Sequence, residues 1–269
     1  MSVPAMRSIP RRVLPGPLWH KAQFLKLRAA HLPMRVTSEG RASRERLAAY
    51  RDAHQGETCA ILGNGPSIKD LDLDDLESVP TFCLNRGYLL WEDVERTPDY
   101  YVAVNELVIE QFHREIATLP CPIFVPWIYR DRFEDAPNSV FFETRIDDRF
   151  VTNPLRGIAP GPTVTIAALQ FAYHMGFSTV ILLGIDHRFE TEGPPHAEIR
   201  QNGDDPNHFR GDYFGEGTRW NLPDLEHSER GYALAREAFE AGDRQVLNAT
   251  PGSALDVFER IELQAAVVA

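Results

Sequence analysis

The sequence lacks the features that mark secreted, membrane-spanning or disulfide-linked proteins. Its 269 residues include three cysteines, Cys59, Cys83 and Cys121, which are widely spaced and each lie in an apolar run. Such an odd set fits neither a disulfide framework nor the paired spacing of a zinc site, so we expect these residues in the core. No apolar run approaches the ~18–20 residues that cross a bilayer, and the start of the chain has no apolar signal-peptide segment. These absences predict a cytoplasmic protein.

The composition is that of a globular protein, with 43% hydrophobic and 25% charged residues. The length predicts one large domain, with an appendage at most. The formal net charge is −11, but residues 1–51 hold 11 of the 28 basic residues and only two acidic ones, Glu39 and Glu45. That segment is therefore strongly basic and the remainder strongly acidic, which argues against a general nucleic-acid surface. We expect no nucleic-acid partner.

The basic segment predicts an N-terminal arm over residues 1–55, ahead of a main domain over 56–269. It favours a short basic amphipathic helix, followed by a second helix at about 40–54. The arm would lie on an anionic membrane surface at the inner face, or pack against the acidic body or a neighbouring subunit. Peripheral membrane contact and a homo-oligomer both stay open. The apolar residues of the arm are Trp19, Phe24, Leu25 and Leu27.

From Thr58 onward, short apolar runs alternate with helical ones, which is typical of a parallel sheet covered by helices. This pattern predicts an α/β fold with a Rossmann-like, doubly wound, mostly parallel sheet. Residues 187–223 are rich in Gly, Pro, Asp, Asn and His and have no clear period, which predicts a long binding loop or lid. The expected strands are 58–62, 81–85, 100–105, 122–127, 179–186 and 245–248. The expected helices are 106–119, 163–175 and 225–241.

A glycine-rich turn follows the first expected strand and consists of Gly63, Asn64, Gly65, Pro66 and Ser67. Glycines let a ligand approach the backbone closely, and amides at the start of a following helix attract anions. The turn would lie at the carboxyl end of a strand, where doubly wound folds bind nucleotides. We interpret it as a phosphate-binding turn, with an ordinary β-to-α turn as the alternative. It is neither a P-loop nor a dinucleotide fingerprint.

Further polar positions are expected in the same crevice. Asn85 and Asn105 end the next two expected strands, where a carboxamide can bind ribose hydroxyls or a base edge. Thr163 is expected to cap a helix that begins there, and Gly184 precedes Asp186 at the end of a central strand. These residues would complete a nucleotide-binding site.

The candidate catalytic residues are Asp186 and His187, at the end of that strand, and His208 in the lid. His208 is the preferred general acid or base, because imidazole exchanges protons near neutral pH. The other lid residues expected to contact the substrate are Asn207, Asp212 and Tyr213.

We predict no resident metal. Asp186, His187, His196, His208 and Asp212 could supply nitrogen and oxygen ligands, but no H-x-x-x-H spacing connects them. Mg²⁺ that arrives with a nucleotide diphosphate fits these residues better. We therefore expect no tightly bound cofactor.

Together the motifs resemble those of the MptE-like superfamily over roughly residues 57–261. That superfamily includes archaeal 6-hydroxymethylpterin diphosphokinases and the central domain of motility-associated (Maf) flagellin glycosyltransferases. It is related in fold to bacterial CMP-sialic-acid-dependent sialyltransferases. The resemblance rests on the turn from Gly63 to Ser67, on Asn85 and Asn105, on the helix from Thr163 that ends in Met175-Gly176-Phe177, on the strand from Val180 to Asp186, and on the segment from Asn248 to Phe258.

The resemblance implies a Rossmann-like fold that binds nucleotide phosphates near the turn, with Asn85, Asn105 and the Thr163 turn on the donor nucleotide. The sequence departs from the sialyltransferase branch at the positions of its catalytic residues. His187-Arg188 stand where those enzymes carry Phe-Tyr, and Asp212 stands where their catalytic histidine follows a His-Tyr-x-Gly run. His208 or His187 would have to supply the base instead.

Three functions stay open for the main domain. The first is a glycosyltransferase that uses a nucleotide-activated sugar, such as a CMP-linked one, in surface glycan synthesis, with His208 deprotonating the acceptor hydroxyl. The second is a Mg²⁺-dependent diphosphokinase that transfers a pyrophosphoryl group from ATP to a hydroxymethylpterin-like substrate. The third is a non-catalytic nucleotide-binding protein. We prefer the first, with a nucleotide or nucleotide-sugar donor and a glycan or small-molecule acceptor as partners.

Overall fold

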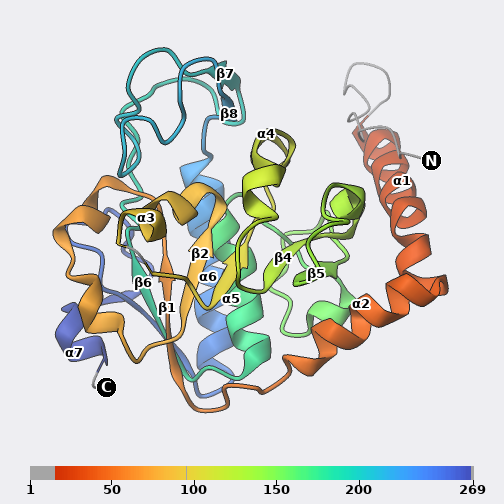
Figure 1. Ribbon diagram of the computed structural model, residues 1–269, viewed down its shortest axis with the longest axis horizontal. Helices are drawn as coiled ribbons and strands as arrows, with labels where there is room; N and C mark the ends of the chain where they lie inside the picture. The colour runs from red at the N-terminus through yellow and green to blue at the C-terminus, as the bar shows by residue number, and fades with distance from the viewer. Residues whose placement is uncertain (1–15, 95, 268–269) are drawn as a thin grey trace.

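The computed structural model describes residues 16–94 and 96–267 (Figure 1). An eight-stranded sheet crosses its centre in the order β10-β9-β6-β1-β2-β3-β4-β5, and all neighbouring strands run parallel. The expected Rossmann-like α/β fold is thereby confirmed. The strands are β1 (Thr58–Leu62), β2 (Thr81–Leu84), β3 (Tyr100–Val102), β4 (Ile123–Pro126), β5 (Ser139–Phe142), β6 (Thr179–Leu183), β9 (Gln245–Asn248) and β10 (Glu259–Arg260).

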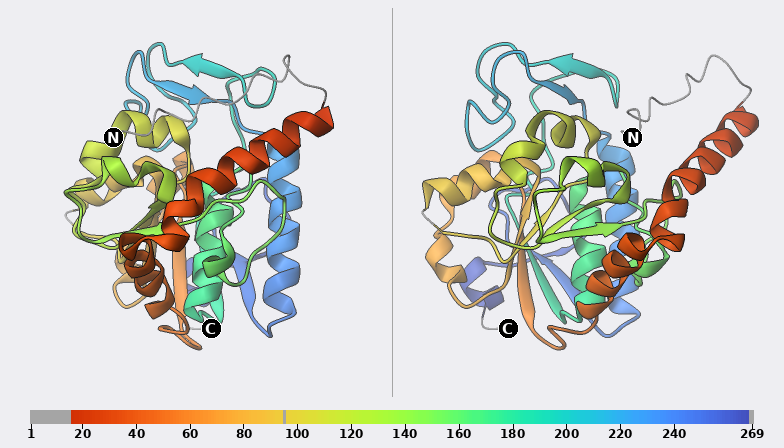
Figure 2. Two further views of the ribbon diagram at one scale, coloured as in Figure 1. Left: turned by 90° about the vertical axis from the view of Figure 1, so that its right-hand side faces the viewer. Right: turned by 45° about the vertical axis from the view of Figure 1, so that its right-hand side comes forward.

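Helices cover both faces of the sheet (Figures 1 and 2). Leu47, Phe171 and Phe239 belong to the apolar core on one face, and Trp91 and Ile109 belong to the core on the other. Because the central strands are buried on both faces, they have continuous apolar sequences rather than alternating ones. The first face carries α2 (Ser38–Ala49), α5 (Val164–Met175) and α6 (Leu225–Glu240). The second carries α3 (Tyr88–Asp93), α4 (Glu106–Ile116) and α7 (Leu263–Val267).

The strand order reverses between β1 and β6. From β1 the chain builds the sheet outward through β2 to β5, and it then returns to add β6, β9 and β10 on the other side. Leu62 at the end of β1 lies opposite Leu183 at the end of β6. In open α/β sheets, ligands bind at the carboxyl ends of the two strands that flank such a reversal.

The structure shortens several expected strands. β2, β3 and β6 end before the polar residues that the sequence analysis placed at their ends. Asn85 adopts a positive φ of 50° and Gly184 a positive φ of 64°, and both turn the chain out of the sheet. β5 was not expected. The expected helices at 106, 163 and 225 are confirmed to within a few residues, and the three cysteines are free and buried, as expected.

The lid, residues 187–223, contains regular structure that the sequence analysis missed. β7 (Glu198–Arg200) and β8 (Arg219–Asn221) form a separate antiparallel pair. The pair lies beyond the carboxyl ends of the central strands, at the top of Figure 1. The lid therefore has a folded tip.

The arm forms α1 (Gly16–Val36), which is longer than the short helix expected and contains Pro33 near its end. It projects from the body and turns into α2 at Thr37, whose hydroxyl oxygen accepts the amide hydrogen of Gly40 (Figure 2). Residues 1–15 of the arm lie outside the described residues. Among the helices that the structure describes, none is both long enough and apolar enough to cross a membrane.

Candidate nucleotide-binding and catalytic site

A cavity of about 520 Å³ opens at the carboxyl ends of β1 and β6, beneath the lid. Its volume is in the range of small-molecule sites. The candidate residues Pro66, Ser67 and Asp212 do not line it. The candidate residues that do line it are Gly63, Asn64, Gly65, Asn85, Asn105, Thr163, Gly184, Asp186, His187, Asn207, His208 and Tyr213.

The turn after β1 is fastened to the end of β6. The Gly63 amide donates to the carbonyl of Leu183 at 2.7 Å, and the Gly65 amide donates to the carbonyl of Gly184 at 3.0 Å. A Cβ at Gly63 would collide with the Gly184 carbonyl oxygen, and one at Gly65 would collide with the Asp186 carboxylate. The two glycines therefore allow β1 and β6 to approach closely at this point.

The Asp186 carboxylate accepts hydrogen bonds from the Ser67 donors that were expected to bind a phosphate. Its carboxylate accepts hydrogen bonds from Ser67 Oγ at 2.7 Å and from the Ser67 amide at 3.3 Å. The helix that follows is one short 3₁₀ turn, η1 (Pro66–Asp70), and Pro66 itself is exposed. An internal carboxylate accepts both donors in this structure, so a phosphate at the turn would have to displace Asp186. The same contact occupies Asp186, so this residue is no longer a free partner for His187.

Three longer helices begin at the cavity instead. Asn105, Thr163 and Asp224 lie on its wall, and each caps its own helix, α4, α5 or α6. The expected cap at Thr163 is confirmed. Helix N-termini carry partial positive charge and unpaired amides, so this end of the cavity attracts anions. Asn105 uses its carboxamide oxygen in the cap and keeps only its NH₂ group for a ligand.

Two other carboxamides have unused oxygens. Asn64 donates from Nδ2 to the Leu84 carbonyl at 3.0 Å, and Asn85 stands in η3 (Asn85–Gly87). The Oδ1 atoms of both side chains are buried and have no hydrogen-bond partner among the described residues. Buried polar atoms are normally paired, so these oxygens are candidate acceptors for ligand hydroxyl or amino groups.

The lid supplies a histidine–aspartate pair. His208 Nδ1 lies 2.7 Å from Oδ2 of Asp205, whose side chain is fully buried. The carboxylate holds Nδ1, and Nε2 has no hydrogen-bond partner among the described residues. This is the geometry of a general base. Residue type and position in the lid predict His208 as a candidate, whereas Asp205 was not among the candidates, although the D-x-x-H spacing within the lid signals it.

Tyr213 supports that pair from below. Its ring stacks on the His208 imidazole, with 4.0 Å between the centroids and 6° between the planes. Its hydroxyl oxygen accepts the amide hydrogen of Arg86 at 3.2 Å. Tyr213 therefore orients the imidazole, and its hydroxyl is occupied by the protein rather than by the expected substrate contact.

The other lid candidates are also used by the protein. The Asn207 carboxamide accepts from the Glu190 amide at 2.7 Å and donates to Thr191 at 2.8 Å, which joins two parts of the lid. Asp212 pairs with Arg210 at 2.9 Å, and that guanidinium lowers the pKa of the Asp212 carboxyl. The side chains of Asn207 and Asp212 therefore contact other residues of the lid in this structure, rather than being free for the expected substrate contacts.

His187 lies at the cavity wall with a positive φ of 55°. Its Nε2 is 3.2 Å from the Glu229 carboxylate on α6, and its ring meets the Tyr232 ring edge to face. The side chain is largely buried. His187 is thus tied to α6, whereas His208 has a buried partner at Nδ1 and, among the described residues, none at Nε2.

Residues 40–192, more than half of the chain, match the family model described as 6-hydroxymethylpterin diphosphokinase MptE-like. The chain belongs to the MptE-like family. The resemblance inferred from the motifs is thereby confirmed. A search of curated protein sequences finds no match to this MptE-like chain.

Two solved structures are similar to this MptE-like chain. The Maf glycosyltransferase from Magnetospirillum magneticum AMB-1 is 15% identical, with a TM-score of 0.52 over 83% of this chain and 38% of that chain. The sialyltransferase CstII from Campylobacter jejuni, in complex with the substrate analogue CMP-3FNeuAc, is 16% identical, with a TM-score of 0.45 over 78% of this chain and 87% of that chain. The first likeness shows a shared fold, and the MptE-like chain spans well under half of the Maf enzyme.

Proposed function

We propose that this MptE-like protein is a nucleotide-dependent transferase. The reaction that fits the cavity best moves a sugar from a nucleotide-activated donor, such as a CMP-linked one, to a hydroxyl of a glycan or small-molecule acceptor in surface glycan synthesis. The observation that carries the proposal is the His208–Asp205 pair at a cavity into which three helix N-termini point. A hydroxyl acceptor needs a base, and a departing nucleotide needs its negative charge stabilised.

Each part of the cavity has a role in this reaction. The start of α5 around Thr163 would hold the phosphate and stabilise the charge that develops as the nucleotide leaves. Asn64 and Asn85 would bind the nucleoside through their unpaired oxygens. As the acceptor oxygen bonds to the anomeric carbon, the bond from that carbon to the phosphate oxygen breaks and the nucleotide keeps the electron pair. His208 Nε2 accepts the acceptor proton, and Asp205 stabilises the imidazolium.

A Mg²⁺-dependent diphosphokinase is the second candidate, and the description of the matching family favours it. The helix N-termini would then hold ATP phosphates, with Mg²⁺ between them, and His208 would deprotonate a hydroxymethyl group. Asp186 follows the end of β6, where its carboxylate accepts the Ser67 hydroxyl, and it would be the carboxylate offered to the ion. The two reactions therefore differ in their nucleotide and in their need for Mg²⁺.

Thermal-shift measurements separate these functions, because a ligand that binds only the native state raises its Tm. The purified protein is tested with CMP, CDP, UDP, GDP, ATP and AMP, each with and without Mg²⁺. We expect a cytidine or uridine nucleotide to stabilise the protein without Mg²⁺. Stabilisation by ATP only in the presence of Mg²⁺ would establish the diphosphokinase instead. The absence of a shift with every nucleotide would overturn the nucleotide site.

We also propose that α1 brings the protein to an anionic membrane surface. Lys21 and Arg28 are exposed on it, next to the apolar side chains of Phe24, Leu25, Leu32 and Val36, which are 46–64% exposed. Apolar side chains among cations suit the boundary between lipid headgroups and acyl chains. Cosedimentation with phosphatidylglycerol vesicles, and not with phosphatidylcholine vesicles, is expected, and Phe24→Ser with Leu25→Ser should abolish it. Concentration-dependent dimerisation lost in the same variant would assign the surface to a second copy.

A further inference from the structure

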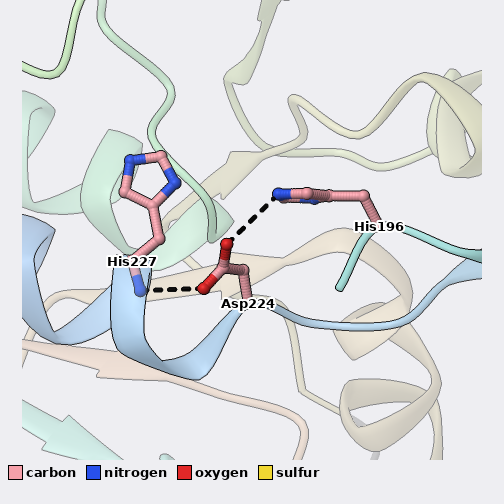
Figure 3. A group of neighbouring side chains, drawn as sticks. All are labelled: His196, Asp224 and His227. Carbon is pink, nitrogen blue, oxygen red and sulfur yellow. Dashed lines mark hydrogen bonds and ion pairs between the residues drawn. The ribbon is translucent and has the colours of Figure 1, made fainter. Parts of the chain in front are cut away.

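Two histidines and an aspartate meet at the rim of the cavity, apart from the pair at His208 (Figure 3). His196 belongs to the lid, Asp224 caps α6, and His227 lies in the first turn of α6. One donor atom from each residue lies within 4.8 Å of the other two. His196 and Asp224 line the 520 Å³ cavity, and His227 lines a second cavity of about 350 Å³.

Apart from the ion pair between His196 and Asp224, the donor atoms that face each other have no partner among the described residues. Asp224 Oδ1 accepts the amide hydrogen of His227 at 2.9 Å, which leaves Oδ2 for another partner. His227 Nε2 lies 3.0 Å from Oδ1 of Asp148, which leaves Nδ1. Figure 3 shows the carboxylate of Asp224 between the two imidazoles. Each of the three residues thus offers one lone pair toward the same small space.

The distance between His196 Nε2 and Asp224 Oδ2 is 3.4 Å. This is longer than the 2.7–3.2 Å of an ordinary N–H···O hydrogen bond. It matches the separation of about 3.3 Å between two ligands that each lie about 2.0–2.1 Å from a tetrahedral zinc ion. The spacing therefore suits a shared metal ion better than a direct hydrogen bond.

We propose that His196, Asp224 and His227 bind one divalent transition-metal ion, with Zn²⁺ as the ion that this donor set suits best. Imidazole nitrogens favour Zn²⁺ over Mg²⁺, which prefers oxygen ligands. Asp148 orients the His227 ring, as carboxylates behind metal-binding histidines commonly do. Three protein ligands leave a fourth position for water or for a group bound in the cavity. The sequence predicts no resident metal, and the proposed site differs from that prediction.

The ion would also join the lid to the body. His196 comes from the lid and adopts a positive φ of 64°, whereas Asp224 and His227 belong to α6. Metal binding would therefore order the lid over the cavity. This proposal does not rest on the transferase reaction, because it concerns the ligand-free protein and a metal ion alone.

The first test is calorimetric titration of chelator-treated protein with Zn²⁺, together with Co²⁺ as a spectroscopic probe. We expect saturable binding of one equivalent of Zn²⁺, and visible Co²⁺ bands of a low-coordinate site. His196→Asn, Asp224→Asn and His227→Gln should each weaken binding by at least about tenfold, and Asp148→Asn by roughly 10–100-fold. No saturable binding by the wild type would overturn the proposal.

These variants are chosen so that loss of binding does not reflect loss of folding. Asparagine tolerates a positive φ at position 196, and it preserves the helix cap at position 224. Glu226→Gln is the matched control, because Glu226 is an exposed carboxylate in the same turn of α6 that pairs with Arg230. Metal-free Tm values should agree among all variants, and equal binding by the variants and the wild type would contradict the assignment.

Limited proteolysis tests the effect on the lid. Zn²⁺ should slow cleavage within residues 187–223 of the wild type by several-fold, and it should have no such effect on His196→Asn. Equal protection of both proteins would show that His196 does not connect the ion to the lid.

Discussion

The turn after β1 and the lid face the same cavity but use their polar groups in opposite ways. In the turn, Gly63, Gly65 and Ser67 donate to acceptors at or just beyond the end of β6. In the lid, His208 pairs through Nδ1 with a buried carboxylate, and its Nε2 has no partner in the part of the chain that the structure describes. The segment with the most recognisable sequence motif is therefore held by internal hydrogen bonds, and the segment with the least regular structure carries the proposed base.

The largest effect expected from this contrast is on turnover. His208→Ala should lower the rate of transfer by about 10²–10⁴-fold, because the acceptor proton loses its base. Nucleotide binding should persist, since the phosphate is proposed to lie at the start of α5. The measurement is release of nucleotide from CMP-, UDP- and GDP-linked sugars with an oligosaccharide acceptor.

The matched control for that variant is His113→Ala on α4, which should keep the wild-type rate. An unchanged rate in His208→Ala, or an equal loss in both variants, would contradict the role given to the lid.

The framework role of the turn predicts a large loss of stability. A Cβ at Gly63 meets the backbone oxygen of Gly184, which cannot move without shifting β6. Gly63→Ala should therefore lower the free energy of unfolding by about 3 kcal/mol. Urea denaturation measures this, with Gly215→Ala in the lid as the control, because a Cβ there meets no atom within 4 Å. Similar losses in the two variants would remove the distinction between the regions.

The contact between the arm and the body should weaken in acid. His31 on α1 accepts from the Thr144 amide at 3.1 Å, and burial lowers its pKa to about 4. The unfolded chain protonates this residue near pH 6.5 and the folded one does not, so stability is full above that pH and is lost as the pH falls toward 4. Between pH 7 and 5 the loss amounts to about 2 kcal/mol.

Urea denaturation of the wild type and of His31→Gln across this pH range measures that loss. The variant should lack this part of the pH dependence, because glutamine does not titrate. Identical pH profiles for the two proteins would show that protonation of His31 does not cause the loss of stability in acid.

The smallest predicted effect is the loss of stability in Ser67→Ala, which separates a structural role of Ser67 from a role in nucleotide binding. Ser67→Ala removes a hydrogen bond to the Asp186 carboxylate and should cost about 1–2 kcal/mol of stability. The thermal shift produced by a nucleotide should remain, since Ser67 does not line the cavity. If Ser67→Ala has the wild-type Tm but shows no shift with a nucleotide, the phosphate binds at the turn and not at α5.

Much of the fold could be predicted because buried parallel strands have continuous apolar sequences. β1 and β9 are found with the expected bounds, but β5 is a short strand after Pro137-Asn138 and was missed. Strand ends were placed too late at Asn85 and Asn105, since a strand ends where its neighbours stop hydrogen bonding. That limit depends on other strands and not on the local residues.

The location of the cavity could be predicted from the sequence, but the contacts of its individual residues could not. The residue types after β1 and β6 indicated the cavity, because strand ends at an order reversal converge. The contact between Ser67 and Asp186 joins residues far apart in the chain, and no local pattern reveals it. The same is true of His196 with Asp224 and His227, whose spacing has no metal-binding signature.

Calorimetric titration of the most stabilising nucleotide into Thr163→Val and Ser67→Ala decides whether the phosphate binds at the start of α5 or at the turn after β1. Thr163→Ser, which keeps the hydroxyl, is the control. Thr163→Val should weaken binding by about tenfold or more, and Ser67→Ala should bind like the wild type, if the phosphate lies at α5 as proposed and Ser67 serves only to hold Asp186. Binding lost in Ser67→Ala and unchanged in Thr163→Val would contradict this assignment.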